Sequence, residues 1–551
     1  MLLLVIQHSW GYKSKQLGKE RVYMRSFNTT GVCVPEKHYM VDISDKVNQI
    51  IELVDAGKYF SINRARQYGK TTTITALARE LEKKYVVLSL DFQGISAAGF
   101  KTEQSFVQEF SRLVLNKIKA GIEAPSSVEE TLMGYVARSE NKAKLGELFD
   151  VLTQWCSEKE IVLIIDEVDS ASNNQVFLDF LAQLREGYIR RDSAGIATFK
   201  SVILAGVTDV KNIRSKIRDD EQHKVNSPWN IAADFDVDMR LYENGIEGML
   251  LDYASEHEVK IDTKMMAQEI FDYTGGYPFL VSRICQIIDE KLVPSKFASL
   301  ADAWSSDGLD EAVKTLLMES NTLFESLVGK LENYPILKVA LRSILMEGST
   351  MPFNNYQDEI SQMKMYGFIQ NKDGFVAISN RIFETFLYNY YLSAEIMHDN
   401  DFYRESSLGR NRFVVNGELQ VKEILQGFID AFAEIYGPLE EKFKEKDGRE
   451  YFLLYLKPII NGTGNYYIEA QTRDQKRTDV IIDYLGKRYI IEMKIWHGER
   501  YNQAGEEQLC EYLDYYKLNE GYMLSFNFNK NKAPGVYEVP VNGKVLYEGV
   551  V

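Results

Sequence analysis

Cysteine is scarce in this sequence. The 551 residues include four cysteines, which are Cys33, Cys156, Cys285 and Cys510. No two of them have the spacing of a metal-binding pair, and four in a chain of this length do not make a disulfide framework. The scarcity argues against a disulfide-stabilised secreted domain and favours a reducing compartment, so we expect a cytoplasmic protein.

Long apolar runs are also missing. The opening MLLLVIQHSW has only roughly six continuous apolar residues and no basic region before them, which is too little for a secretory signal. No stretch reaches the length of a transmembrane helix, so we expect no membrane partner. If translation starts at Met24, residues 1–23 are an extension of the chain and not part of its fold.

An excess of basic charge is absent as well. The formal net charge is −16, which argues against a chain that coats nucleic acid non-specifically but leaves room for a local basic groove. The chain is 45% hydrophobic and 26% charged, as globular domains are. Its length predicts three or four domains at roughly 100–200 residues each. It contains no internal repeat and no low-complexity tract.

The first half of the chain alternates apolar runs with helical patterns. Buried strands are predicted at 58–67, 85–92, 160–169 and 201–210, where Val, Ile and Leu are frequent. Amphipathic helices are predicted between them, at 71–84, 103–121, 142–159 and 175–191. This alternation predicts an α/β fold with a mostly parallel sheet that is covered on both faces.

A phosphate-binding loop is predicted between the first strand and the first helix. The stretch INRARQYGKTTT ends in Gly69, Lys70 and Thr71, although Arg64 stands where the pattern G-x-x-x-x-G-K-[ST] has its first glycine. Lys70 would reach the β- and γ-phosphates and Thr71 would bind Mg²⁺, while backbone amides at the helix start hold phosphate oxygens. An exposed loop with a lysine is the alternative for this stretch alone.

Two carboxylates at the end of a later strand strengthen this prediction. IVLIIDEVD places Asp166 and Glu167 after a run of apolar residues, where the first can bind Mg²⁺ and the second can polarise the attacking water. The next strand ends at Thr208 and Asp209, and Thr208 either senses the γ-phosphate or caps the strand. The predicted nucleotide-binding residues are Arg66, Gln67, Tyr68, Gly69, Lys70, Thr71, Thr72, Asp166 and Thr208, with Glu167 catalytic.

These stretches resemble the AAA-like ATPases of bacteria that carry a C-terminal PD-(D/E)XK nuclease-like domain. The likeness lies in FNTTGVCVPEKHYMVDISDK, INRARQYGKTTT, VLIIDEVD, ILAGVTDV, SPWNIAADFDVDM and YTGGYPFLVSRIC, and it covers about 24–290 and 446–515. It implies the additional-strand (ASCE) P-loop sheet shared with STAND and archaeal ATPases, and an arginine at position 64 is usual for it. Gly276, Tyr277 and Pro278 match the G-x-P signature of the lid. Arg283 could approach the phosphates, or simply face the core or solvent.

The rest of the chain divides into smaller parts. We expect an N-terminal extension (1–23), an AAA-like P-loop ATPase core (24–240), a helical lid (241–320), a winged-helix-like domain (321–400), a helical connector (401–445) and a PD-(D/E)XK nuclease-like α/β domain (446–551). The winged-helix prediction rests on the order of helix, helix and hairpin, with Asp373-Gly374 at the hairpin turn.

A second site is predicted in the last segment. Asp479 lies on one predicted strand, and Glu492 and Lys494 lie on the next, where residues two apart share a face. Two carboxylates can hold a divalent metal ion, and the lysine can activate a water for phosphodiester attack. This is the spacing of the PD-(D/E)XK core, although a solvated strand face with charges is a serious alternative.

Other residues complete this second prediction. Gln508 and Tyr512 share one face of the following helix, and either Glu450 or Glu469 would supply a further acid. Residues 446–551 contain 14 basic and 15 acidic residues, so this segment is almost neutral although the whole chain is acidic. The basic residues near the predicted strands suit either a phosphate backbone or a solvated hairpin. They are Arg473, Lys476, Arg477, Lys487 and Arg488.

Two functions fit these patterns. The first is an ATP-binding and ATP-hydrolysing protein with a metal-dependent nuclease domain. Its candidate partners are ATP, Mg²⁺ or Mn²⁺, nucleic acid and further copies of the chain. The second is a STAND-like ATP-driven signalling switch, whose tail is a non-catalytic binding module. Metal-dependent cleavage of nucleic acid distinguishes the two functions.

Overall fold

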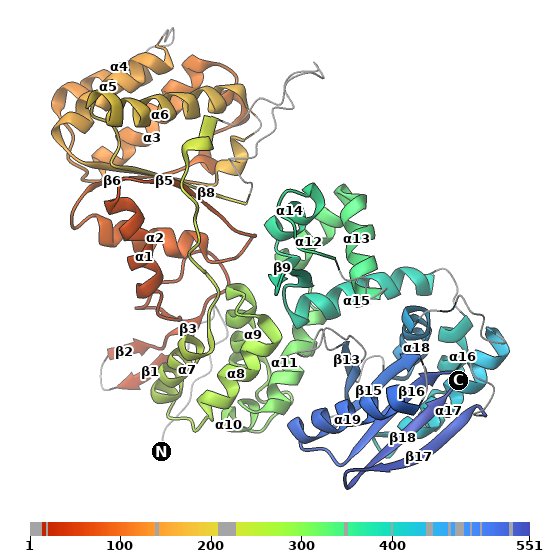
Figure 1. The fold of residues 1–551 in the computed structure, drawn as a ribbon. Coiled ribbons are helices and arrows are strands. Elements are labelled where there is room, and N and C mark those ends of the chain that lie inside the picture. The colour runs from red at the N-terminus through yellow and green to blue at the C-terminus, as the bar shows by residue number, and fades with distance from the viewer. Residues whose placement is uncertain are drawn as a thin grey trace. The chain divides into compact units, whose positions relative to one another are not determined.

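The computed structural model describes most of the chain and divides it into two units (Figure 1). Unit 1 comprises Met1–Glu258, Gly276–Gln286 and Met365–Gly367, and unit 2 comprises Val259–Gly275, Ile287–Lys364 and Phe368–Val551. The described residues are 14–17, 20–137, 143–172, 174–207, 228–346, 351–397, 401–436, 443, 445–460, 464–468, 479–484, 487–495, 499–527 and 533–551. Within them, no helix combines the length and apolar character needed to cross a bilayer.

The central sheet of unit 1 has four parallel strands in the order β5-β8-β7-β6. Their bounds are Tyr59–Asn63 (β5), Val86–Asp91 (β6), Ile161–Asp166 (β7) and Ser201–Gly206 (β8). Every residue of β7 and β8 is buried, as expected for apolar strands covered on both faces. The parallel α/β prediction is confirmed, and each predicted strand is a few residues shorter than its apolar run.

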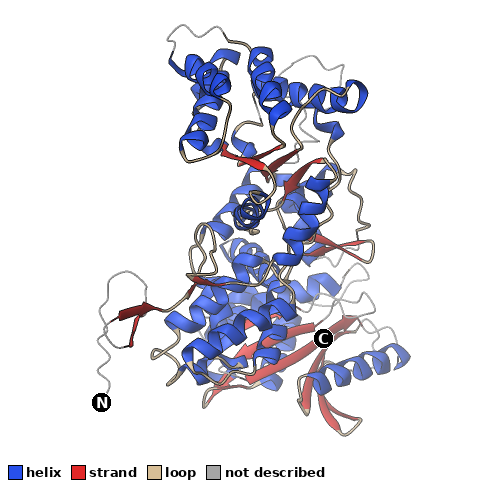
Figure 2. Ribbon diagram, turned by 90° about the vertical axis from the view of Figure 1, so that its left-hand side faces the viewer, coloured by secondary structure: helices blue, strands red, loops and turns tan. Residues whose placement is uncertain are grey.

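Helices cover both faces of this sheet (Figures 1 and 2). On one face, α1 (Ser44–Asp55) and α2 (Lys70–Leu81) pack their apolar sides against the strands. The other face carries α3 (Glu103–Lys119), α4 (Ser126–Ala137), α5 (Leu145–Glu158) and α6 (Gln175–Ala194). Helix α3 begins where the hydroxyl of Thr102 accepts from the backbone N–H of Ser105, within a capping box.

A segment that we call the strap, residues 233–242, follows the outer strand β5. Ala233 donates its backbone N–H to Tyr59 O at 2.7 Å, and Val237 and Met239 are buried in the core beneath α1 and α2. The strap then enters α7 (Glu243–His257), and the backbone N–H of Leu241 donates to Gly276 O at 2.8 Å. It thereby connects the edge of the sheet to the residues just before α9 (Pro278–Lys291).

Short strands precede the sheet. β3 (Ser26–Phe27) pairs in parallel with β4 (His38–Tyr39), and β1 (Ser14–Leu17) pairs antiparallel with β2 (Glu20–Tyr23). Phe27 and Tyr39 pack against Tyr253 of α7, with ring centroids 5.3 and 5.2 Å away. The chain from Ser26 onward is therefore part of the packed unit.

The first part of unit 2 is helical and ends in a hairpin. Its helices are α8 (Thr263–Thr274), α10 (Leu300–Ala303), α11 (Ser306–Met318), α12 (Thr322–Asn333), α13 (Pro335–Met346), α14 (Asp358–Met365) and α15 (Arg381–Met397). The strands β9 (Ile369–Lys372) and β10 (Phe375–Ile378) form the expected hairpin. Asp373 and Gly374 both have positive φ, as this tight turn requires.

The last part of unit 2 is a six-stranded mixed sheet in the order β13-β14-β15-β16-β18-β17. Its strands are Gly464–Ile468 (β13), Asp479–Tyr484 (β14), Lys487–Ile495 (β15), Glu520–Phe526 (β16), Gly535–Val541 (β17) and Lys544–Val550 (β18). The first four overlap the apolar runs NYYIEAQT, RTDVIIDYLG, RYIIEMKIW and GYMLSFNF, which the sequence predicts as strands, and the last two were not predicted.

Helices cover both faces of this second sheet. On one face lie α17 (Val421–Ile435) and α18 (Glu445–Ile460), where Gly549 approaches Leu425 and Gly448 approaches the Phe526 ring. On the other lies α19 (Glu499–Tyr515), whose Leu509 and Leu513 pack with Ile481 and Ile490. Helix α16 (Asp401–Phe413) and the short strands β11 (Val414–Val415) and β12 (Glu418–Leu419) precede α17.

Candidate functional site

The loop between β5 and α2 contains two residues in the left-handed conformation just before the helix begins. Gly69 is the residue before α2 and has φ of 79°, a left-handed conformation that glycine adopts without strain. Gln67 also has a positive φ, of 57°. Helix α2 starts at Lys70 and buries Ile74 and Leu77 against the sheet, which directs its N-terminus toward the loop.

Lys70 lies inside this loop. Its Nζ donates to the backbone oxygens of Arg64 and Ala65, each at 3.0 Å, and only 7% of the residue is exposed. Burial lowers the pKa of Lys70, although the nearby carboxylates of Glu167, Asp169 and Asp166 work in the opposite direction. The ammonium group is therefore held inside the loop by two backbone carbonyls.

Thr71 and Asp166 come together across the sheet end. The Thr71 hydroxyl donates to Asp166 Oδ2 at 3.1 Å, and the backbone N–H of Glu167 donates to Asp166 Oδ1 at 2.9 Å. Burial raises the pKa of Asp166 despite these hydrogen bonds. A hydroxyl beside a desolvated carboxylate suits Mg²⁺, which is usually held by one or two such ligands together with substrate phosphates.

Glu167 follows directly and is held in an unusual backbone conformation, with φ of 55°. Burial, and then the neighbouring Asp166 carboxylate, raise the pKa of Glu167. Asp169, a residue not predicted, fixes this turn because its Oδ2 accepts from the backbone N–H of Val207 at 2.7 Å. Thr208, the next residue after Val207, lies outside the described residues.

The remaining predicted loop residues have other contacts. Arg66 is exposed, and its backbone oxygen accepts a hydrogen bond from the Tyr277 hydroxyl. The ring of Tyr68 packs edge-on against Tyr277, with centroids 4.7 Å apart. Thr72 Oγ1 accepts from the backbone N–H of Cys33 at 3.1 Å, so the N-terminal segment crosses the start of α2.

The lid signature also lies at the loop. The ring of Pro278 would be 3.7 Å from a Cβ built on Gly69, so the start of α9 closes this side of the loop. Arg283 Nη1 donates to Gln286 Oε1 at 2.6 Å, and Gln286 also contacts the Thr29 hydroxyl at 3.1 Å. The Arg283 guanidinium thus donates a hydrogen bond within the lid helix, to the residue three positions later.

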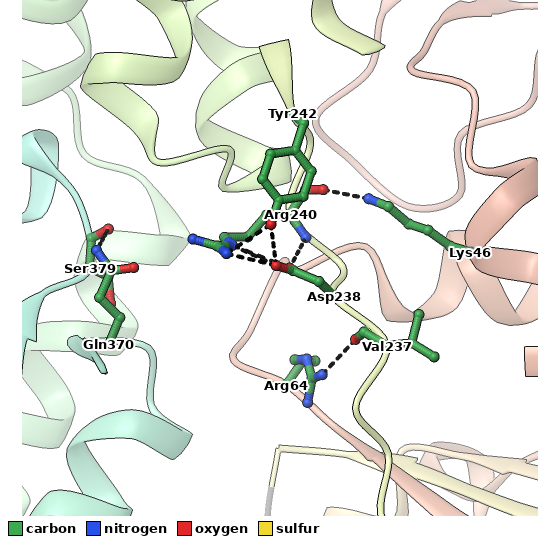
Figure 3. Close-up of polar contacts among 8 residues, drawn as sticks. All are labelled: Lys46, Arg64, Val237, Asp238, Arg240, Tyr242, Gln370 and Ser379. Carbon is green, nitrogen blue, oxygen red and sulfur yellow. Dashed lines mark hydrogen bonds and ion pairs between the residues drawn. The ribbon is translucent and has the colours of Figure 1, made fainter. Parts of the chain in front are cut away.

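The strap residues form a polar network beside this loop (Figure 3). Arg240 Nη2 donates to Asp238 Oδ2 at 2.7 Å, and the Tyr242 hydroxyl donates to the same oxygen at 2.5 Å. Burial raises the pKa of Asp238, but the hydrogen bonds from Arg240 and Tyr242 outweigh burial and lower this pKa to about 2. Lys46 of α1 donates to the backbone oxygen of Arg240 at 2.5 Å, which anchors the strap to the first helix.

The second predicted site is partly described. In the antiparallel pairing of β14 with β15, Asp479 is the register partner of Glu492, and directly opposed positions lie on one face of a sheet. Glu492 and Lys494 are buried, with 3% and 2% exposed. A Cβ on Gly505 of α19 would lie 2.6 Å from Lys494 Nζ, so the lysine amine lies directly under this helix.

The other residues predicted for this second site lie in different surroundings or outside the described residues. Gln508 is three positions after Gly505 on α19, and its side chain, like that of Asp479, lies outside the described part of the structure. Tyr512 is buried in the core beneath the helix. Glu450 pairs with Arg342, with Oε1 2.8 Å from Nη2. Glu469 lies outside the described residues.

A buried carboxylate that was not predicted lies on the same sheet face. Glu548 of β18 is 1% exposed, and its Oε1 accepts from the Ser525 hydroxyl at 2.7 Å. Ser525 is the register partner of Lys494, and Glu548 is the register partner of Met523, which pairs with Glu492. Nothing in the sequence pattern singles out Glu548, because its strand has no uniform apolar run.

Two residues of the predicted basic cluster are described, and both form ion pairs. Lys487 pairs with Glu418, and Arg488 contacts Asp483 Oδ1 at 2.9 Å and Asp310 Oδ2 at 3.3 Å. The Arg488 guanidinium also lies over the Tyr516 ring, 4.7 Å from its centroid. These two side chains therefore hold the hairpin in place. Arg473, Lys476 and Arg477 lie outside the described residues.

Comparison with known proteins gives one family. The profile of a family described as AAA-like domain matches residues 34–389, which is more than half of the chain. An uncharacterised WD repeat-containing protein of Synechocystis, slr0143, is 22% identical over 253 residues, which make up 44% of this chain and 19% of that protein. The chain therefore spans about a fifth of this relative's length.

Several solved structures show weaker similarity. The Walker-type ATPase PABY2304 of Pyrococcus abyssi is 16% identical, covering 66% of this chain and 99% of that one, with a TM-score of 0.44. A RuvB variant of Thermotoga maritima is 15% identical, covering 62% and 92%, with a TM-score of 0.32. The ORC2 protein of Aeropyrum pernix is 12% identical, covering 64% and 93%, with a TM-score of 0.32. TM-scores below 0.5 do not establish a common arrangement over these lengths.

Proposed function

The chain belongs to the AAA-like domain family, and we propose that it binds ATP with Mg²⁺ at the loop between β5 and α2 and hydrolyses the γ-phosphate. The observation that carries this proposal is the contact between Thr71 Oγ1 and Asp166 Oδ2 at 3.1 Å, with Lys70 beside it in the same loop. A hydroxyl, a carboxylate and an ammonium group thereby meet at one helix N-terminus, which is the set that a nucleoside triphosphate with its metal ion requires.

Each residue has a role in this proposal. Lys70 would exchange its two backbone carbonyl partners for phosphate oxygens, which compensate its charge better than neutral carbonyls do. Thr71 and Asp166 would hold Mg²⁺, which supplies charge neutralisation on the phosphates. Glu167 would orient the attacking water and accept its proton, a task that its raised pKa favours at neutral pH.

Two substitutions test the ATP site. Lys70→Ala should abolish ATP binding in a calorimetric titration of the full chain, while Glu167→Gln should bind ATP and hydrolyse it at least about 100-fold more slowly, the range for losing a general base. Lys83→Ala serves as the matched control, because Lys83 is an exposed lysine that pairs with the exposed Glu80 one helical turn earlier. Equal turnover by the Lys70→Ala variant and the unmodified chain would refute the assignment.

We infer a second candidate function for the last sheet, metal-dependent cleavage of nucleic acid. What supports it is the register pairing of Asp479 with Glu492, together with the burial of Glu492 and Lys494 on one sheet face. Burying an acid and a lysine is costly unless they pair or serve a purpose. Two carboxylates would hold Mg²⁺ or Mn²⁺, Lys494 would activate water, and Gln508 would stand at the edge of the site.

A nuclease assay with Mg²⁺ or Mn²⁺, with and without ATP, tests this second function on DNA and RNA. Glu492→Gln should remove cleavage and leave ATP hydrolysis unchanged. Glu511→Gln is the control, because Glu511 is an exposed acid on the neighbouring helix α19. If the unmodified chain cleaves no nucleic acid but changes conformation with ATP, the tail is a binding module and the chain is an ATP-driven switch.

A further inference from the structure

Arg64 occupies the position where a phosphate-binding loop usually has its first glycine, and it is held on several sides. Its backbone N–H donates to Gly206 O of β8 at 3.2 Å, which extends the pairing of β5. Its Nη1 donates to Asn63 O at 2.9 Å and its Nη2 donates to Val237 O at 2.8 Å. The guanidinium lies over the Phe235 ring, 5.2 Å from the centroid (Figure 3 shows the bond to Val237).

The partner of Arg64 is itself well fixed. Val237 is 7% exposed within the core of unit 1, and Phe235 stacks on Phe60 of β5 with centroids 5.8 Å apart. Further along the strap, Asp238, Arg240 and Tyr242 form the network described above. An arginine fork that reaches such a segment binds to a rigid support and not to a loose loop.

The backbone of the same residue meets the phosphate-binding lysine. Arg64 O accepts from Lys70 Nζ at 3.0 Å, next to Ala65 O at the same distance. The position of the Lys70 ammonium therefore depends on where the Arg64 peptide is held. A glycine at position 64 would keep the backbone contacts but would lose both guanidinium hydrogen bonds and the contact with Phe235, and it would add backbone freedom.

We propose that Arg64 is a positioning residue of the ATP site, which replaces the flexibility of the usual glycine with a side-chain anchor to the strap. The anchor holds the loop open for phosphate and fixes the carbonyl against which Lys70 rests before ATP arrives. This inference rests on the proposed ATP site and adds to it the residue that preorganises the loop. Where other phosphate-binding loops have a flexible glycine, this chain has an arginine whose side chain is hydrogen-bonded to Val237.

The test places at position 64 the glycine that the general phosphate-binding loop pattern has there. Arg64→Gly in the full chain should bind ATP at least about 10-fold more weakly, since a tenfold change is about 1.4 kcal/mol, the scale of one hydrogen bond to a charged group. Arg64→Lys should recover only part of the loss, because a single ammonium nitrogen does not reproduce the planar fork that bonds the two carbonyls from separate nitrogens while it lies over the ring. Phe235→Leu should weaken binding about threefold, as the loss of one cation–π contact would. Arg79→Ala, at an exposed position near the end of α2, is the control and should change nothing.

Hydrogen exchange without nucleotide separates positioning from general destabilisation. In Arg64→Gly, amides of the loop and of the strap should exchange faster, while the buried amides of β7 stay protected. If β7 also loses protection, Arg64→Lys decides the matter, and full ATP affinity in that variant would overturn the proposal. ATP affinity of Arg64→Gly within about twofold of the unmodified chain, with β7 protected, overturns it while leaving the ATP site intact. Absence of ATP binding by the unmodified chain would remove both.

Discussion

Replacing Asp310 by asparagine should remove a pH dependence from the stability of unit 2. Asp310 lies on α11, with 19% of its side chain exposed, and it accepts a hydrogen bond from the Tyr273 hydroxyl at 2.7 Å. Burial, and then the Asp483 carboxylate, raise the pKa of Asp310 to about 7, while the Arg488 guanidinium opposes them and Glu269 adds to them. The folded chain therefore holds this proton more tightly than the unfolded chain does.

The sign and size follow from proton linkage. Because the pKa is raised on folding, the contribution of Asp310 to stability is fully present below about pH 4 and is lost as the pH rises to about 7. The difference between the ordinary value of 3.8 and about 7 sets an upper limit of about 4 kcal/mol, at about 1.4 kcal/mol per pKa unit. With part of the side chain in water and Arg488 adjacent, we expect about 1–2 kcal/mol.

Hydrogen exchange measures this effect locally. At pH 8, the amides of α11 and of the hairpin formed by β14 and β15 should exchange more slowly in Asp310→Asn than in the unmodified chain, and the difference should vanish at pH 5 or below. Asp307→Asn is the control, because Asp307 is an exposed acid on the same helix. A variant that is less protected than the unmodified chain at pH 8 would refute the reasoning, since it would show that the ion pair with Arg488 outweighs the burial of the charge.

Three further substitutions test other parts of the structure. Gly69→Ala should cost about 1–2 kcal/mol, because φ of 79° is strained for a residue with a Cβ, and a urea titration should show this with a weaker ATP affinity in calorimetry. Gly505→Ala should move the Lys494 amine, which would lie 2.6 Å from the new Cβ, and so reduce any nuclease activity while ATP turnover stays unchanged. Trp229→Phe should lower the free energy of unfolding by about 1 kcal/mol, because the buried bond from Nε1 to Ser61 Oγ at 2.7 Å is lost.

The sequence predicts a site residue best where a polar side chain ends a continuous apolar run, because such a run is typical of a buried strand. The run IVLIIDEVD predicts both β7 and the place of Asp166 at its end. In the structure all six residues of β7 are buried, as this apolar run predicts. The strands β14 and β15 are likewise predicted from their apolar runs, and their observed pairing makes Asp479 the register partner of Glu492.

Other features depend on contacts that no local pattern reveals. The bond of Arg64 to Val237 joins residues 173 positions apart, and that of Arg488 to Asp310 joins residues 178 apart. Strand β17 has only exposed and half-buried positions and contains Pro540, which is typical of an edge strand and gives no apolar run to detect in the sequence. Without β17 and β18, the sequence could not predict that Glu548 shares a face with Lys494.

The strap has a consequence for how copies of this chain could associate. The outer strand of a sheet has unpaired backbone N–H and C=O groups. A strand from another molecule can form hydrogen bonds with them, which leads to continuous sheets and aggregation. Here β5 is the outer strand of the four that the structure describes, and the strap follows it from Ala233 onward with buried side chains at Val237 and Met239. Any assembly that extended this sheet through β5 would first have to pull the buried side chains of the strap out of the core, so the strap disfavours association of copies along this edge.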